Sequence, residues 1–269
     1  MGKEWLELPV CKTVELTGRP YSLTPEGKRA LRELFRKVVK GEEAWPSNQT
    51  RVLDGYVLAP PEGVGELRAK LRDQNFAFVV NHLGRCPAGA VGLAIYTNLC
   101  IKQVCGREPR LVLGAGRTIV SAIRKEISQS TKFILAEGGI QEILEEIDKG
   151  ECVGIYPEGG NSCSLNRGSF KTGRFLLHVA ERGVPIVCLG VTFKDNTFSG
   201  RLSLPIDLDK VRQLGYSTEN KREAGQRVVD YVMAELARLL PEHLRGHYRE
   251  QAAASDGGPV ATGQAQTSR

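Results

Sequence analysis

The apolar positions between Thr24 and Gly41 recur three and four residues apart, which is the spacing of one face of a helix. Thr24 can cap the first turn, a proline at position 25 suits that turn, and Gly41 can end the helix. The opposite face carries cations at positions 28, 32, 36, 37 and 40. This pattern predicts a basic amphipathic helix. Such a helix more often packs its apolar side on a core than lies on a membrane surface.

Beyond this helix, short apolar runs alternate with helical patterns. Strands are expected at 76–80, 110–113, 132–136, 151–156, 185–191 and 201–204, and helices at 89–104, 117–127, 140–149, 170–182 and 217–240. The strand runs are apolar without alternation, as strands covered on both faces are. The order predicts a single α/β domain whose mainly parallel or mixed sheet is flanked by helices.

The chain is expected to divide into three parts. Residues 1–62 form an N-terminal helical extension packed on the core, residues 63–250 form the α/β domain, and residues 251–269 form a disordered tail. No apolar run reaches the roughly 18 residues of a spanning helix, and the first residues lack the order of a signal peptide. We therefore expect a cytoplasmic protein that associates with the membrane peripherally.

Composition and charge exclude some classes of function. The apolar content of 41% and charged content of 25% are typical of a globular protein. The net charge is +6, and cations gather at 101–132 and 167–174, where they can attract phosphates or anionic lipid. Aromatic residues make up only 6% and no base-reading signature is present, so nucleic acid is not expected as a partner.

The seven cysteines form no CxxC pair. Their spacing is wrong for a structural zinc site, so neither a metal nor a cofactor is expected. Several of them stand in apolar runs, where reduced cysteine packs as a small hydrophobe. A reducing compartment fits this pattern better than secretion does.

Two expected strands end in residues that can carry chemistry. Asn81 and His82 follow the strand at 76–80, and Glu158 follows the strand at 151–156 with two glycines directly after it. In sheets of this kind, chemistry lies at the carboxyl ends of the strands. We therefore expect His82 and Glu158 to lie close together across one cleft.

Three stretches together resemble the glycerophospholipid acyltransferase superfamily, which includes the 1-acylglycerol-3-phosphate acyltransferases. They are VVNHLGRCPAG at 79–89, CVGIYPEGGNS at 152–162 and FKTGRFLLHVAERGVPIVCLGV at 170–191. The family has N-H-x4-D after one strand, F-P-E-G-T-R-S at the end of another, F-K-x-G at the start of a helix, and then a G-V-P-I-V-P-V strand. Order and spacing agree between residues 76 and 191.

The resemblance implies an acyltransferase-like fold and a reaction. A fatty acyl group would move from a thioester, on coenzyme A or acyl carrier protein, to the hydroxyl of a lysophospholipid or similar acceptor at an anionic membrane surface. His82 would be the catalytic base, and Glu158 would face the acceptor. The residues assigned to substrate binding, by this match or as nearby cations, are Asn81, Arg85, Gly159, Gly160, Asn161, Ser162, Lys171 and Arg174.

The sequence departs from the family at its charged positions. The motif aspartate is replaced by Pro87, which cannot orient an imidazole. The arginine of E-G-T-R is replaced by Asn161, and Ala136 and Glu137 stand where another arginine is expected. The changed positions are the charged ones, whereas the apolar and glycine positions that support the fold are retained.

Three interpretations of these departures stay open. Another carboxylate, Glu158 or Glu137, could orient His82 in an active enzyme. The protein could instead be a non-catalytic relative that binds lipid or acyl-CoA. Finally, Cys86 lies four residues after His82, so the two could share a helical face and carry an acyl-enzyme.

The middle of the chain also permits a different functional interpretation. RLVLGAGRTIVSAIRKEISQSTKFILAE, at 110–137, imitates a dinucleotide-binding unit. Gly114 and Gly116 follow an apolar strand, and Glu137 ends the next strand, where an acid that binds ribose would stand. The third glycine position holds Ile119, however, and its bulk would push the helix from the strand. An NAD(P)-binding oxidoreductase is therefore the weaker alternative.

Overall fold

The computed structural model describes residues 23–71, 74–83, 89–113, 130–135, 139–158 and 163–254. Its strands form one seven-stranded sheet in the order β1-β7-β6-β2-β5-β3-β4. They are β1 Val57–Leu58, β2 Ala77–Val80, β3 Arg110–Leu113, β4 Ile134–Leu135, β5 Val153–Ile155, β6 Ile186–Lys194 and β7 Thr197–Leu202. Strands β6 and β7 are antiparallel, and the other neighbouring pairs are parallel. The predicted mainly parallel, mixed sheet is confirmed.

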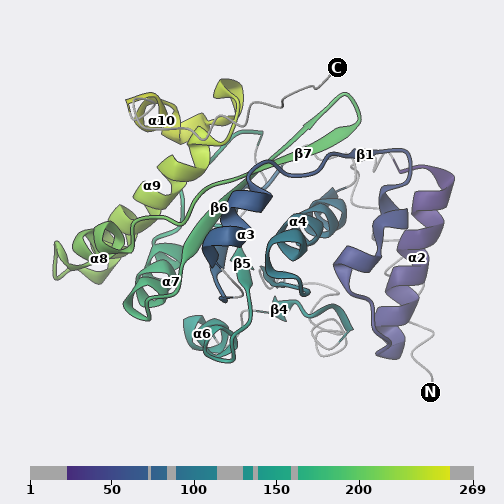
Figure 1. Ribbon diagram of the computed structural model, residues 1–269, viewed down its shortest axis with the longest axis horizontal. Coiled ribbons are helices and arrows are strands. Elements are labelled where there is room, and N and C mark those ends of the chain that lie inside the picture. The colour runs from purple at the N-terminus through teal and green to yellow at the C-terminus, as the bar shows by residue number, and fades with distance from the viewer. Residues whose placement is uncertain are drawn as a thin grey trace.

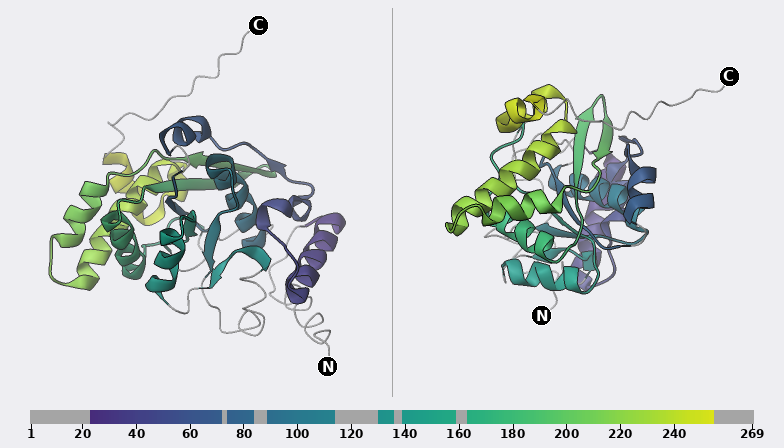
Figure 2. Two further views of the ribbon diagram at one scale, coloured as in Figure 1. Left: turned by 60° about the horizontal axis from the view of Figure 1, so that its bottom comes forward. Right: turned by 60° about the vertical axis from the view of Figure 1, so that its left-hand side comes forward.

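Helices cover both faces of this sheet (Figure 1). They are α2 Pro25–Lys40, α3 Val64–Leu71, α4 Gly89–Cys105, α6 Ile140–Asp148, α7 Phe170–Glu181, α8 Leu208–Tyr216, α9 Lys221–Arg238 and α10 Arg249–Ala254, with short 3-10 turns at Pro46–Asn48, Thr50–Leu53, Glu242–Leu244 and Gly246–Tyr248. Both views in Figure 2 show α7, α8 and α9 together on one side of the molecule and α2 on the other side. Among the helices in the described ranges, none is both long enough and apolar enough to cross a membrane.

Successive residues of β2 face two different hydrophobic cores. Phe78 and Val80 pack into the core that α2, α3 and α4 share, whereas Ala77 and Val79 pack into the core of α6, α7 and α9. All four side chains are completely buried. Because both faces of the strand must be apolar, its sequence shows no alternation of polar and apolar residues.

Helix α2 forms as its sequence predicts. The Thr24 hydroxyl accepts a hydrogen bond of 3.0 Å from the backbone N–H of Gly27, and Gly41 ends the helix with a left-handed φ of 73°. The buried residues of α2 belong to the same core as those of α4. Strand β1, which also lies within the segment predicted as a helical extension, pairs in parallel with β7 at one edge of the sheet.

Helices α7 and α9 cross at two glycines. A Cβ atom added to Gly173 would lie 1.7 Å from the carbonyl oxygen of Gly225, closer than any two such atoms can approach. The glycine of the FKTG stretch is therefore required by helix packing. This close crossing fixes the position of α7, whose first turn follows the PEGGNS stretch.

The structure differs from the prediction in several elements. Helices α3 and α8 were not expected, and the helix expected from residue 217 begins at Lys221, where the Asn220 side chain caps it. Strand β7 begins at Thr197 because a tight turn, with positive φ at Asp195 and Asn196, joins it to β6. Residues 251–254, expected as the start of a disordered tail, complete α10 instead, and Ala252 is buried; residues 255–269 lie outside the described residues. The helix expected at 117–127 lies outside the described residues.

Candidate active site

The ends of two strands bring Asn81, His82 and Glu158 to one edge of the sheet. Strand β2 pairs in parallel with β5 on one side and with β6 on the other. Asn81 and His82 directly follow β2, and Glu158 lies three residues beyond the end of β5. Because parallel strands point the same way, their carboxyl ends lie together at this edge.

Asn81 continues the pairing of β2 with β6 through its side chain. Its Nδ2 atom donates to the carbonyl oxygen of Val191 at 2.9 Å, and the N–H of Val191 donates to its Oδ1 atom at 2.7 Å. The side chain is almost completely buried, with 3% of the residue exposed. These two bonds fix the backbone directly before His82. Substrate binding by Asn81 stays a prediction.

Glu158 connects two backbone segments through its carboxylate. The backbone N–H of His82 donates to Oε1 at 2.8 Å, and the backbone N–H of Asn166 donates to Oε2 at 2.9 Å. The two strand ends therefore meet as the sequence predicts. The carboxylate binds the main chain of His82, so the contact fixes where the histidine leaves β2.

The imidazole of His82 is half-buried beside Tyr156. The two ring centroids lie 4.8 Å apart, with an angle of 49° between the ring planes. Burial lowers the pKa of His82 below its ordinary value of 6.5, because the charged form is poorly solvated there. The ring is therefore neutral near pH 7 and able to accept a proton. Nδ1 is buried and has no hydrogen-bond partner in the part of the chain that the structure describes.

Residues near the C-terminus hold the segment that follows Glu158. The hydroxyl of Tyr248 accepts from the N–H of Gly168 and donates to Asp230, each at 2.8 Å. The N–H of Ser169 donates to the carbonyl oxygen of Pro157 at 2.9 Å. Tyr248 could not be found from the sequence, because it lies 80 positions from Gly168 and no local pattern links the two. Tyr156 could have been found, since it occupies the aromatic position before the Pro-Glu pair.

Two of the predicted cations stand on the first turns of α7. The Ser169 hydroxyl accepts from the N–H of Lys171 at 3.3 Å and caps the helix. The side chain of Lys171 is exposed, and that of Arg174 is half-buried. The bond between Ser169 and Pro157 places this helix end next to Glu158 in space. A helix N-terminus favours anions, and two cations strengthen that preference.

The other predicted site residues lie outside the described residues. They are Arg85, Cys86, Pro87, Gly114, Gly116, Ile119, Ala136, Glu137, Gly159, Gly160, Asn161 and Ser162. Their assigned roles, and the dinucleotide-binding alternative that depends on some of them, stay predictions. Within the described ranges, no three His, Cys, Asp or Glu side chains gather where they could hold a metal ion.

No protein-family model matches the sequence, and no curated protein matches it. Among solved structures, the chain is similar to the 1-acyl-sn-glycerophosphate (LPA) acyltransferase PlsC from Thermotoga maritima. That similarity covers 86% of this chain and 95% of the other, with 15% sequence identity and a TM-score of 0.40. At this identity and TM-score, the similarity supports no conclusion about what this chain does.

Proposed function

We propose that the protein is an O-acyltransferase that moves a fatty acyl group from a thioester to the hydroxyl of a lysolipid or related acceptor. The observation that supports this most is the contact between the two motif positions. His82 stands at the end of β2 with a neutral, half-buried ring, and its backbone is bound by Glu158 from the end of β5. These are the two positions that match the family's histidine motif and its P-E-G stretch.

In the proposed reaction, His82 acts as a general base. Its imidazole takes the proton from the acceptor hydroxyl while that oxygen attacks the thioester carbonyl carbon. The carbon–sulfur bond then breaks, and the departing thiolate takes the proton from the imidazolium. Since burial lowers the pKa of His82, the base is in its proton-accepting form near pH 7. Backbone N–H groups at Gly159 and Gly160 are proposed to bind the carbonyl oxygen as it gains charge.

Asn81 and Glu158 act as positioning residues in this proposal. Asn81 fixes the backbone before His82 against β6, and Glu158 fixes the N–H of His82 itself. A base must lie within hydrogen-bond reach of the proton that it removes, so small errors in its position are costly. Glu158 thus contributes through the backbone, whether or not it also faces the acceptor.

The charge distribution supports the proposed substrates and the proposed membrane contact. Lys171 and Arg174, at the N-terminus of α7, are proposed to bind the anionic part of the acceptor or of an acyl-CoA or acyl carrier protein donor. The exposed face of α2 is also strongly basic and is proposed to face an anionic membrane surface. Its exposed cations are Lys28, Arg29, Arg32, Arg36, Lys37 and Lys40.

A second candidate function is binding of lipid or acyl-CoA without catalysis. It is favoured by the Nδ1 atom of His82, which has no partner among the described residues. In triad enzymes, removal of the carboxylate that orients the histidine lowers turnover about 10⁴-fold. Because Pro87 stands in place of the motif aspartate, the motif supplies no carboxylate that could orient the imidazole.

Release of free thiol from acyl-CoA, measured with a panel of lysophospholipids, distinguishes the two functions. We expect a slow release that depends on the acceptor and disappears in His82→Ala. The matched control is His243→Ala, which removes an exposed imidazole outside the motif positions and should keep the wild-type rate. Equal rates for wild type and His82→Ala between about pH 6 and 9 would reject catalysis by His82. Retained binding of acyl-CoA in that case would support the second candidate.

A further inference from the structure

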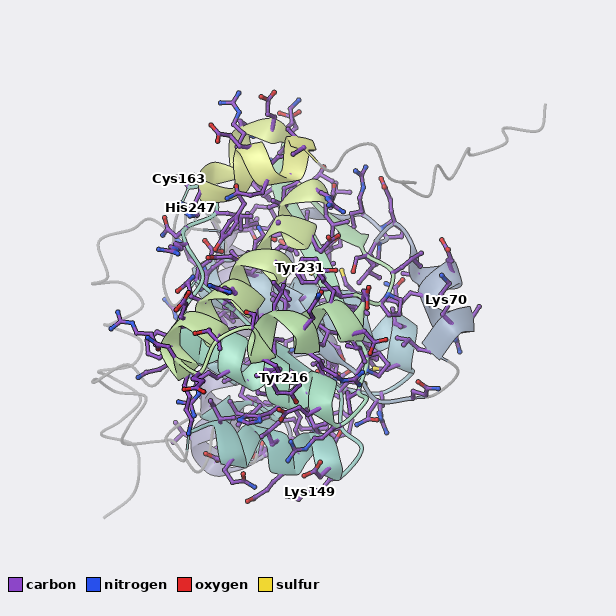
Figure 3. The ribbon with its side chains drawn as sticks, turned by 90° about the vertical axis from the view of Figure 1, so that its left-hand side faces the viewer. Lys70, Lys149, Cys163, Tyr216, Tyr231 and His247 are labelled. Atoms are coloured by element: carbon purple, nitrogen blue, oxygen red, sulfur yellow. The ribbon has the colours of Figure 1, made fainter. Side chains whose placement is uncertain are left out.

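The C-terminal segment, residues 241–254, holds the connecting segment, residues 165–169, which leads to α7. The N–H of Leu165 donates to the carbonyl oxygen of Leu244, and the N–H of His247 donates to the carbonyl oxygen of Leu165, each at 2.9 Å. Figure 3 shows Cys163 and His247 next to each other where the two segments meet. The connecting segment is therefore fixed along one side by the end of the chain.

Tyr248 makes the buried part of this attachment. The residue is completely buried, and its hydroxyl accepts from the N–H of Gly168 at 2.8 Å. The same hydroxyl donates to Asp230 of α9 at 2.8 Å, and Gln226 donates to the same carboxylate oxygen at 2.8 Å. Burial raises the pKa of Tyr248, so the phenol keeps the proton that it donates. The hydroxyl therefore joins the connecting segment to α9.

The other side of the connecting segment binds the residues that end at the candidate active site. The N–H of Ser169 donates to the carbonyl oxygen of Pro157, and the N–H of Asn166 donates to Oε2 of Glu158, each at 2.9 Å. Oε1 of Glu158 accepts from the N–H of His82 at 2.8 Å. The two donors of the connecting segment flank the glycine that the tyrosine holds. A continuous series of hydrogen bonds and short chain segments thus runs from the C-terminal segment to the end of β2.

We propose that Tyr248 is a positioning residue for His82 and acts through the connecting segment and Glu158. Without the hydroxyl, the N–H of Gly168 has no acceptor in a buried place, and the connecting segment must move or loosen. The carboxylate of Glu158 is then held less firmly on one side, and so is the N–H of His82. The catalytic consequence rests on the proposed function, in which the imidazole must reach the proton of the acceptor hydroxyl.

Amide hydrogen exchange at His82, followed by NMR on the full chain well below its thermal midpoint, tests the positioning directly. Tyr248→Phe keeps the ring and removes only the hydroxyl. We expect the N–H of His82 to exchange about two- to tenfold faster in this variant, since losing one hydrogen bond favours local opening by about that factor. The matched control is Tyr96→Phe, another buried tyrosine, whose hydroxyl donates to the carbonyl oxygen of Ala59 at 2.8 Å. It should leave exchange at His82 at the wild-type rate. An unchanged rate in Tyr248→Phe, or the same increase in both variants, overturns the proposal.

A second variant reaches the connecting segment through a different contact. Gly246 has a φ of 48°, and a Cβ atom added there would lie 2.1 Å from the carbonyl oxygen of Leu165. Gly246→Ala should therefore displace the connecting segment and also speed exchange at His82. Gly183→Ala is its control, because that glycine has a φ of 69° and no atom within 4 Å of the added Cβ. Equal exchange at His82 in the two glycine variants would count against the proposal. If Gly246→Ala does not fold, the two tyrosine variants still decide.

Thiol release from acyl-CoA tests the catalytic consequence separately. Tyr248→Phe should lower kcat several-fold and leave KM for acyl-CoA near its wild-type value, because the crossing with α9 at Gly173 still fixes α7. A raised KM with unchanged kcat would assign Tyr248 to substrate binding and overturn the positioning role. Faster exchange at His82 in a protein whose wild type releases no thiol would reject the proposed function and still support the positioning by Tyr248.

Discussion

The backbone N–H of His82 donates a hydrogen bond of 2.8 Å to the carboxylate of Glu158, although 76 positions separate the two residues. The second carboxylate oxygen accepts from Asn166, so one side chain fixes both the end of β2 and the segment that leads to α7. Glu158 is thus part of the framework that places the imidazole. Replacing it should disturb the fold and the candidate active site together.

Glu158→Gln should lower the free energy of unfolding. A carboxamide has one acceptor oxygen, so one of the two backbone N–H groups would face an NH₂ group without an acceptor. One of these two bonds is part-buried and the other is exposed, so the loss should cost about 0.5–1.5 kcal/mol. Urea denaturation measures the change, with exposed Glu219→Gln as the matched control, expected to stay within about 0.5 kcal/mol of wild type. Equal stability of the two variants would contradict the framework role.

The pH dependence of His82 follows from its lowered pKa. If it is the base, thiol release should rise with pH through a midpoint below 6.5 and be level above it. The contribution of the neutral ring to stability should be complete above pH 6.5. It should decline as the pH falls toward the lowered pKa, because the unfolded chain takes up the proton first. A ring that titrates at or above 6.5 by NMR would refute both expectations.

Gly173→Ala should destabilise the protein strongly. The added methyl group would meet the backbone of α9 at Gly225, and two helices would have to move apart. Overpacking of this kind costs at least about 2 kcal/mol when backbone must shift. Gly65→Ala in α3 is the matched control, since no atom lies within 4 Å of its added Cβ. A small change for Gly173→Ala in thermal unfolding would show that the crossing can relax.

Removing the cations at the start of α7 should weaken binding to anionic membranes. Lys171→Ala combined with Arg174→Ala should lower affinity for phosphatidylglycerol vesicles about thirtyfold at low salt, since each cation near such a surface contributes about 1 kcal/mol. The effect should shrink as salt screens the charges. Lys70→Ala with Lys149→Ala removes the same charge elsewhere on the surface (Figure 3) and should change affinity less. Equal losses of vesicle affinity in the two double variants would show that binding depends on net charge alone.

The parts of the fold that rest on local pattern could be predicted from the sequence. Thr24 and Gly41 mark the ends of α2, and the run at 110–113 coincides with β3. The meeting of His82 and Glu158 could also be predicted, because it needs only two parallel strands in one sheet. Continuous apolar runs indicate strands that are covered on both faces, and such strands are typical of parallel sheets.

Other features depend on tertiary contacts that no local pattern records. The carboxylate of Glu158 binds a backbone N–H of His82, and main-chain groups leave no signature in a sequence. Tyr248 holds Gly168 over a long separation for the same reason. The turn at Asp195 and Asn196 uses residues that tolerate a left-handed backbone but mark a hairpin less clearly than Asn-Gly does.

The order of the strands also bears on how the protein behaves at high concentration. The two outermost strands, β1 and β4, are each two residues long, whereas the longer strands lie inside the sheet. A long open edge would offer another chain a row of unpaired N–H and C=O groups on which to add a strand. Within the described residues, each border of this sheet offers an incoming chain a two-residue strand. The sheet should therefore resist edge-to-edge aggregation even during concentrated handling.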